Sequence, residues 1–409
     1  MASKSKLYVS ALFASGALLF TSFTIPATAA SIAGTKCTKV GSTKIASNLK
    51  HTCVKSGSKL IWNKGVAIKT NSPAKPAPNS SSSTSETNES ASQLVAPTSF
   101  DDLYERRDAI AYTAWKLTGE AIKNGKSNLV NFTRFVGPNT REPGYKTPKI
   151  AYGLVSQAFS KYITPKDVYL IQYGLDDIKW AENKIKSIVT LQEYDELNRN
   201  EGGRLVSSNC SNDCFGAKQV STYSGIAFVL QGVAKSSNGD PMGVARWTLG
   251  HLDAHEFFHA LQRENSKTPG VEPKEWPASW VVEGGAELVQ NLVMSSASFE
   301  EYSKWRRIDS QNILGKNSVV TPEFMSSFLD LANNKDYWRG VDSYYSYNLG
   351  ARIMETLVAI KGPDVLLELH KLTTQIGFEA GFAKIFGTSW PDASPIINKT
   401  IVQMLRENK

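Results

Sequence analysis

Apolar residues between positions 240 and 409 recur at spacings of three and four, the period that gives a helix one apolar face. Segments with this period follow one another with only short polar or Gly/Pro-containing interruptions. The pattern predicts helices over 244–264, 279–295, 299–308, 323–332, 347–360, 363–374 and 396–407. The C-terminal part of the chain is therefore expected to form a mainly helical lobe.

The pattern between residues 99 and 233 alternates between helical and strand-like segments. Helical periodicity covers 101–123 and 150–162, whereas 168–171 and 226–233 are short apolar runs rich in β-prone side chains. Such runs predict a small mixed sheet. We expect an α+β domain over residues 98–409, in which a sheet-containing lobe precedes the helical one.

The first 29 residues have the composition of a secretory signal peptide. Two lysines precede an apolar run over 7–25, and the small residues Ala27-Thr28-Ala29-Ala30 follow it. This pattern predicts cleavage after Ala29, with cleavage after Ala30 as the alternative. An uncleaved membrane anchor is the alternative, but Ser and Gly interrupt the run, which falls short of the roughly 20 apolar residues of a spanning helix. We expect a protein that is secreted or associated with the cell envelope.

Residues 30–70 and 71–97 differ from the rest of the chain. The first segment alternates short apolar and Lys/Ser/Gly stretches around two cysteines and predicts a small Lys-rich module. The second is rich in Pro and Ser and predicts a disordered linker. The motif Gly34-Thr35-Lys36-Cys37, with Thr52-Cys53-Val54, resembles a two-cysteine module at the front of secreted actinobacterial proteins.

The four cysteines form two close pairs, Cys37 with Cys53 and Cys210 with Cys214. Export would place them in an oxidising compartment, where an even number of paired cysteines indicates disulfides. Metal binding is the weaker interpretation, because neither pair has a histidine at zinc-finger spacing. We expect two local disulfide bonds.

The formal net charge of +8 belongs to the N-terminal part of the chain. Residues 1–85 carry eleven Lys and no Asp or Glu, which leaves 35 basic against 38 acidic residues in the remainder. Any contact with an anionic cell wall would therefore run through residues 31–70, although a passive spacer is an equal alternative. No nucleic-acid-binding motif accompanies these lysines, so no nucleic-acid partner is expected.

Three of the five histidines, His251, His255 and His259, fall on one predicted helix at spacings of four. His255 and His259 frame the pattern His-Glu-x-x-His, which places two imidazoles one turn apart on the same face. Glu256 lies about 100° around the helix from His255, where it can take a proton from a metal-activated water without binding the ion itself. A third histidine ligand at His251 would require the ion to span two turns, so we assign His251 a structural role.

The third ligand is expected from the next helix. Glu283 follows His259 by 24 positions, an interval that suits a loop and a helix folding back. The small residues Gly284, Gly285 and Ala286 would let this helix approach the first closely. Glu287, one turn further on, is expected to accept a hydrogen bond from the second nitrogen of a ligand histidine. The set predicts one Zn²⁺ ion.

The pair of motifs, His255-Glu256-x-x-His259 with Glu283-Gly-x-Ala-Glu287, resembles the gluzincin metallopeptidases, which include thermolysin and aminopeptidase N. The resemblance implies a zincin-like fold and hydrolysis of peptide bonds. Tyr347, in Tyr347-Asn-Leu-Gly350, is similar to the tyrosine that stabilises the oxyanion in the aminopeptidase N group; Tyr344 and Tyr345 are alternatives. The Gly-x-Met-Glu-Asn segment of that group is absent from this sequence, so exopeptidase specificity does not follow from the resemblance. Endopeptidase action is the default expectation, and the choice between the two stays open.

The resulting hypothesis is a secreted zinc peptidase with a peptide or protein substrate. The run Ile226–Leu230 is expected to form the sheet edge along which an extended peptide pairs. A non-catalytic, zinc-stabilised envelope-binding protein and a zinc amidase acting on cell-wall peptides are the alternatives. The sequence decides neither substrate nor oligomeric state.

Overall fold

The computed structural model describes residues 35–38, 40, 42–46, 49–56, 59–64, 66–67, 94–235, 248–266, 271–316, 320–332 and 345–407. The chain divides into two compact units, a small one within 17–82 and a large one that includes 83–409. The predicted signal peptide and most of the predicted linker lie outside the described residues. Within the described part, no helix combines the length and hydrophobicity needed to cross a lipid bilayer.

The small unit is an antiparallel sheet built around its longest strand. This strand, β2 (Leu49–Ser56), pairs with β1 (Thr43–Ala46), β3 (Lys59–Trp62) and β4 (Val66–Ala67). The predicted Cys37–Cys53 disulfide is confirmed, and both cysteines are buried. A sheet this small buries few apolar side chains, so we expect the disulfide to contribute a large share of its stability.

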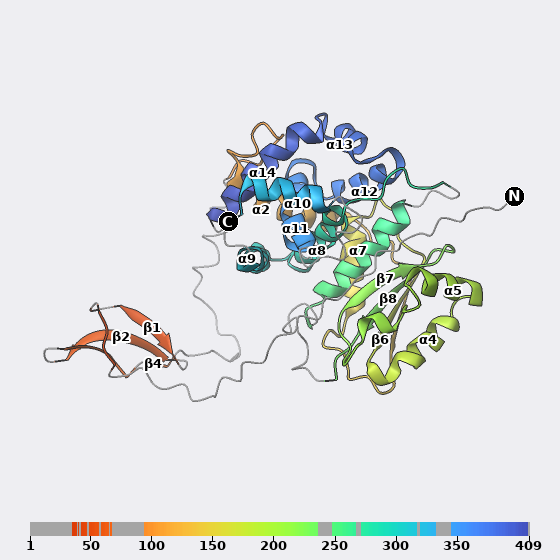
Figure 1. The fold of residues 1–409 in the computed structure, drawn as a ribbon, viewed down its shortest axis with the longest axis horizontal. Coiled ribbons are helices and arrows are strands. Elements are labelled where there is room, and N and C mark those ends of the chain that lie inside the picture. Colours follow the sequence, from red (N-terminus) through yellow and green to blue (C-terminus); the bar gives the residue numbers. More distant parts are fainter. Residues whose placement is uncertain are drawn as a thin grey trace. The chain divides into compact units, whose positions relative to one another are not determined.

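The large unit begins with a four-stranded sheet in the order β5-β6-β8-β7 (Figure 1). Strands β5 (Asn131–Val136), β6 (Asp167–Tyr173) and β8 (Ile226–Gly232) are parallel, and β7 (Ala217–Ser221) is antiparallel to β8. The expectation that 226–230 forms the sheet edge is wrong, because β8 has a partner on both sides. The edges are β5 and β7, and the mostly polar sequence of β7 carries little strand signal.

The central strands β6 and β8 bury side chains on both faces, which explains their nearly continuous apolar sequences. One face carries Val168 and Leu170 and belongs to the main core of the helical lobe. The opposite face carries Ile171 and Tyr173 and packs under α4 (Ile178–Lys186) and α5 (Leu191–Asn200), on one side of the sheet in Figure 1.

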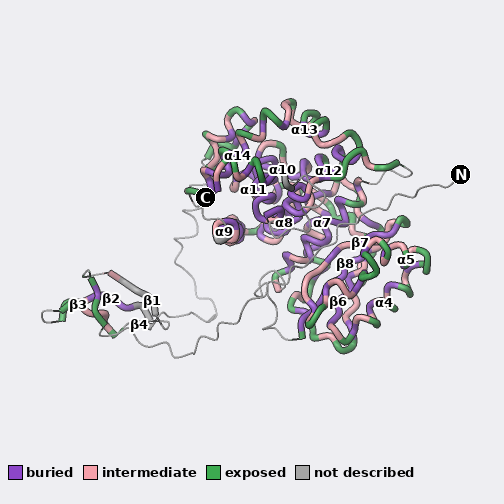
Figure 2. Tube along the Cα trace, viewed as in Figure 1, coloured by how far each residue is buried: buried purple, intermediate pink, exposed green. Residues whose placement is uncertain are grey.

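Helices make up most of the other described residues of the large unit and cover the other face of the sheet. Short 3-10 turns, η1 (Arg107–Ala109), η2 (Leu175–Asp177) and η3 (Ser207–Asn209), accompany them. The remaining helices are α2 (Ile110–Asn124), α3 (Pro148–Ala158), α7 (His251–Ser266), α8 (Ser279–Met294), α9 (Phe299–Lys316), α10 (Pro322–Ala332), α11 (Tyr345–Lys361), α12 (Val365–Ile376), α13 (Phe378–Phe386) and α14 (Trp390–Arg406). Figure 2 shows α8 and α11 buried along most of their length. The expected α+β class is confirmed.

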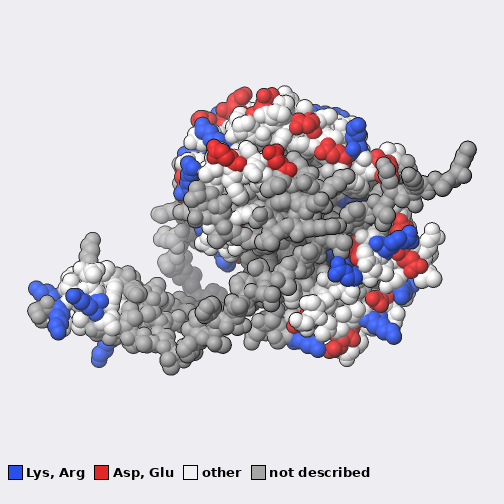
Figure 3. Space-filling view, viewed as in Figure 1, with Lys and Arg blue, Asp and Glu red and all other residues white. Residues whose placement is uncertain are grey.

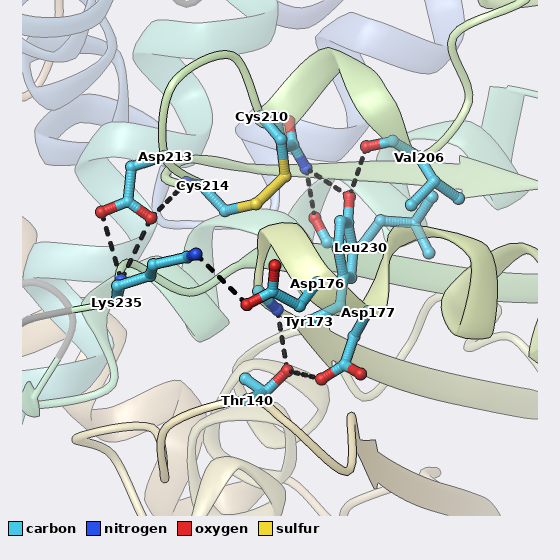
Figure 4. The surroundings of a disulfide bond; sticks show 12 residues. Thr140, Tyr173, Asp176, Asp177, Val206, Cys210, Asp213, Cys214, Leu230 and Lys235 are labelled. Carbon is cyan, nitrogen blue, oxygen red and sulfur yellow. Dashed lines mark hydrogen bonds and ion pairs between the residues drawn. A yellow bond between two sulfur atoms is a disulfide. The ribbon is translucent and has the colours of Figure 1, made fainter.

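The second predicted disulfide, Cys210–Cys214, is also confirmed and closes a tight loop before β7 (Figure 4). The Asp213 carboxylate accepts hydrogen bonds from the backbone N–H groups of Cys214 (2.8 Å) and Lys235 (3.1 Å). These bonds fasten the loop to the segment that follows β8. A cavity of about 410 Å³ opens next to it, where β5, β6 and β8 end; its lining residues are Pro138, Asn139, Thr140, Arg141, Gly174, Leu175, Asp176, Val233 and Lys235.

Candidate metal centre

Helix α7 carries the His-Glu-x-x-His motif through the interior of the large unit. The neighbours of the motif residues, including Ala254, Phe257 and Phe258, are fully buried, because α7 packs against α3, α8 and β7. His255 and Glu256 are each 5% exposed and His259 is 7% exposed. Buried polar groups need partners, so this helix face requires either hydrogen bonds within the protein or a ligand.

Helix α8 brings Glu283 to the two histidines. The Oε2 atom of Glu283 lies 3.2 Å from Nε2 of His255 and 3.4 Å from Nε2 of His259. One ligand atom from each of the three residues lies within 4.8 Å of the others. The structure therefore brings together the three residues predicted to bind the ion, and this buried His-His-Glu group can hold a metal ion.

The geometry of the group fits a small divalent cation. Four ligand atoms at the Zn–N and Zn–O distances of about 2.0–2.2 Å form a tetrahedron with edges of about 3.3 Å. The 3.2 and 3.4 Å separations between Glu283 and the two histidines match that edge, and all three ligand atoms lie within 4.8 Å of one another. In addition, Oε2 of Glu256 is buried without a hydrogen-bond partner. Unpartnered buried carboxylate oxygens of this kind favour a bound cation.

The electrostatics of the group point the same way. Burial raises the pKa of Glu283, but the imidazoles, His259 foremost, outweigh burial and bring this pKa down to about 2. Burial lowers the pKa of His259, yet the Glu283 carboxylate raises it to about 9. For Glu256, burial dominates and raises the pKa above its ordinary value. Glu283 thus stays an anion that holds a positive charge beside it, whereas Glu256 binds its proton more readily.

Residues outside the predicted set orient the ligands. His259 Nδ1 donates to Oε1 of Gln262 (2.7 Å), whose Nε2 donates to the Val282 carbonyl (3.0 Å). These two hydrogen bonds fix the tautomer and the orientation of the His259 ring, with the proton on Nδ1 and with Nε2 towards Glu283. Gln262 is not among the residues predicted from the sequence, although its spacing of three from His259 on one helix could have indicated it. For Glu287, Oε2 lies 3.8 Å from Nδ1 of His255, beyond hydrogen-bonding distance.

Helix α11 places Tyr347 beside the group. Its ring lies 5.9 Å from the His255 ring, nearly parallel to it at 16°. Burial, together with the negative charges of Glu283 and Glu256, raises the pKa of Tyr347 well above its ordinary value, so it stays protonated. Of the alternatives, Tyr345 packs against Phe324 and Phe328, and Tyr344 lies outside the described residues.

The contact between Gly284 and Gly350 sets the position of α11. A Cβ atom on Gly284 would lie 2.4 Å from the Gly350 carbonyl carbon, and one on Gly350 would lie 2.8 Å from the Trp280 carbonyl oxygen. Gly284 was expected to face α7, but it faces α11; Gly285 is the residue near Phe258 of α7. Gly284 on α8 and Gly350 on α11 therefore let the two helices approach closely. Gly350 lies three residues after Tyr347.

The other histidines have structural partners. His251 Nδ1 lies 3.2 Å from Oδ1 of Asn291, and its ring packs 4.4 Å from that of Trp305. His370 Nδ1 lies 2.6 Å from the Ser266 hydroxyl. Neither belongs to the group that can bind a metal.

Comparison with known proteins adds no relative. No family profile, no curated protein and no solved structure matches this chain.

Proposed function

We propose that this protein is a secreted, zinc-dependent peptidase of gluzincin type with a zincin-like fold. The observation that carries the proposal is the buried group of His255, His259 and Glu283, with Glu256 next to His255 on the same helix. Two histidines and a carboxylate are the ligand set of a catalytic zinc site with an open fourth position. The two disulfides support export.

The roles of the residues follow from their chemistry. His255, His259 and Glu283 would hold the ion, which when bound supplies Lewis acidity and lowers the pKa of a coordinated water to about 7. Glu256 is the general base: its unpartnered Oε2 takes a proton from the attacking water and passes it to the leaving amine. Tyr347 remains protonated and donates a hydrogen bond to the oxyanion of the tetrahedral intermediate.

The sheet supports a peptide as the substrate. Strand β7 is one of the two edge strands of the sheet and packs against α7, the helix that carries His255 and Glu256. An extended peptide can pair with such an edge by main-chain hydrogen bonds, which positions its carbonyl groups independently of side-chain identity. A zinc amidase that acts on cell-wall peptides would use the same contacts, so digestion of a mixed peptide library and of isolated wall peptides separates these substrates.

Substitution of the general base tests the proposal. We expect Glu256→Gln to bind one zinc ion per chain as the unchanged protein does, while the rate of peptide cleavage falls by about 10²–10⁴-fold. Glu379→Gln, the same change at an exposed site, is the control and should cleave normally. Cleavage at the unchanged rate by zinc-loaded Glu256→Gln would rule out Glu256 as the general base, whereas no cleavage by the unchanged zinc-loaded protein would favour a non-catalytic zinc protein.

A further inference from the structure

All charged side chains of the small unit are lysines. Residues 31–70 contain eight Lys, no Arg and no Asp or Glu, whereas all thirteen Arg of the chain lie beyond residue 100. On the face drawn in Figure 3, the described residues of the small unit show only positive charges, while the large unit shows both signs. This segregation marks the small unit as a separate cationic surface.

The described lysines surround the β2–β3 hairpin. Lys36, Lys55, Lys59 and Lys64 are all exposed. Lys36 pairs with Ile61, and Lys59 precedes Ile61 by two residues on β3, so these two lysines share one face as diagonal neighbours, about 7–8 Å apart. Lys55 pairs with Leu60 and therefore lies on the opposite face. Both faces of the hairpin thus present ammonium groups.

The scaffold beneath these lysines is fixed. The Cys37–Cys53 disulfide joins the segment next to Lys36 to β2, and the buried ring of His51 bonds through Nδ1 to the Asn63 carbonyl oxygen (2.8 Å). A fixed scaffold holds the charges close together without an ordering cost on binding.

The chemistry of the surface defines the partner. Arg is the residue that recognises single carboxylates or phosphates in a bidentate, directional way, whereas Lys acts as a point charge. Trp62, the one Phe, Tyr or Trp in residues 31–70, is half-buried, so the unit offers no platform for stacking bases. We propose that the small unit binds a flexible linear polyanion with one phosphodiester per repeat, such as poly(glycerol phosphate), and so holds the protein at an anionic cell envelope.

Salt dependence of binding by the full-length protein tests this inference. The probe is synthetic poly(glycerol phosphate), titrated at several salt concentrations. Each lysine–phosphate contact contributes about 0.7 to the slope of log K against log salt, so replacing Lys36, Lys55, Lys59 and Lys64 by Gln should reduce the slope by about 3. The control replaces four exposed lysines of the large unit, Lys123, Lys126, Lys149 and Lys166, by Gln and should change the slope little.

The outcomes are distinct. A reduced slope and more than tenfold weaker binding in the small-unit variant alone would support the proposal. Equal losses in both variants, an unchanged slope, or equally tight binding to single-stranded DNA or to anionic phospholipid vesicles would overturn it. None of these measurements depends on peptidase activity, so the binding inference and the peptidase proposal can fail separately.

Discussion

The helical lobe contains two buried clusters of charged residues, and only one of them has arginine side chains that neutralise its carboxylates. In the arginine cluster of α9 and α11, Glu355 accepts hydrogen bonds from Arg306 (2.8 Å), Arg352 (3.3 Å) and Tyr302 (2.5 Å). Asp309 supplies a second negative charge to the two guanidinium groups. The second cluster is the metal group, which consists of His255, Glu256, His259 and Glu283. In this cluster, by contrast, no Lys or Arg among the described residues forms an ion pair with Glu256 or Glu283.

The difference separates a structural cluster from a binding site. Charges in a dry interior are tolerated when each has an opposite charge and hydrogen bonds. The arginine cluster meets this condition from within the chain and needs nothing further. The metal group holds two carboxylates and two imidazoles, and an imidazole is positively charged only while it is protonated. A divalent ion would supply the positive charge that the arginines supply in the other cluster.

The largest predicted effect is on the arginine cluster. Glu355→Gln would leave two buried guanidinium groups with one carboxylate, so we expect it to lower the free energy of unfolding by about 3–5 kcal/mol. Urea denaturation measures this change. The control is Glu301→Gln, which removes an ion pair with Lys304 whose side chains are 40% and 56% exposed and should cost less than about 1 kcal/mol. Similar losses in both variants would show that the cluster is not a structural centre.

A smaller loss of stability is expected from a substitution at Gly350, which lies on α11 between residues of the two clusters. Gly350 lies between Tyr347 and Arg352, and a Cβ atom there would meet the backbone of α8. Gly350→Ala should therefore destabilise the protein by about 1–3 kcal/mol and also weaken zinc binding, because α8 carries Glu283. In Gly153→Ala, the new methyl meets nothing within 4 Å inside α3, so this control should gain up to about 1 kcal/mol. Unchanged zinc affinity in Gly350→Ala would show that the contact between α8 and α11 does not position Glu283.

The last predicted effect is the response of the metal group to pH. In the metal-free protein the pKa of His259 is raised to about 9, above its unfolded value near 6.5, so its stabilising charge is fully present below pH 6.5 and lost as pH rises through 9. Zinc must displace that proton, so the apparent zinc affinity should rise about tenfold per pH unit over the same interval. Competition with a chromophoric chelator measures it. A flat profile would contradict the coupling of His259 to Glu283.

The sequence predicts the parts of the fold that are buried. Strands β6 and β8 and helices α8, α11 and α12 have strong apolar patterns and were expected within a few residues of their bounds. Strands β5 and β7 and helices α4 and α5 were not expected. Their sequences, such as Ala217-Lys-Gln-Val-Ser221, place few apolar residues in a regular period, because they lie at sheet edges or on the surface.

The site was predictable where local geometry determines it. His255 and His259 lie one turn apart on one helix, so their convergence follows from helical periodicity alone. The contact of Tyr347 with His255 depends instead on the crossing of α8 and α11 at Gly284 and Gly350, and such a crossing leaves no local pattern. The hydrogen bond from His259 to Gln262 depends on rotamers, which a spacing of three permits but does not require.

X-ray diffraction from crystals of the zinc-loaded protein, recorded on both sides of the zinc absorption edge, locates the bound ion. We expect one anomalous peak per chain, about 2.0–2.2 Å from Nε2 of His255, Nε2 of His259 and a carboxylate oxygen of Glu283. A peak at any other site, or none at these three residues in crystals that contain zinc, would contradict the proposed metal site.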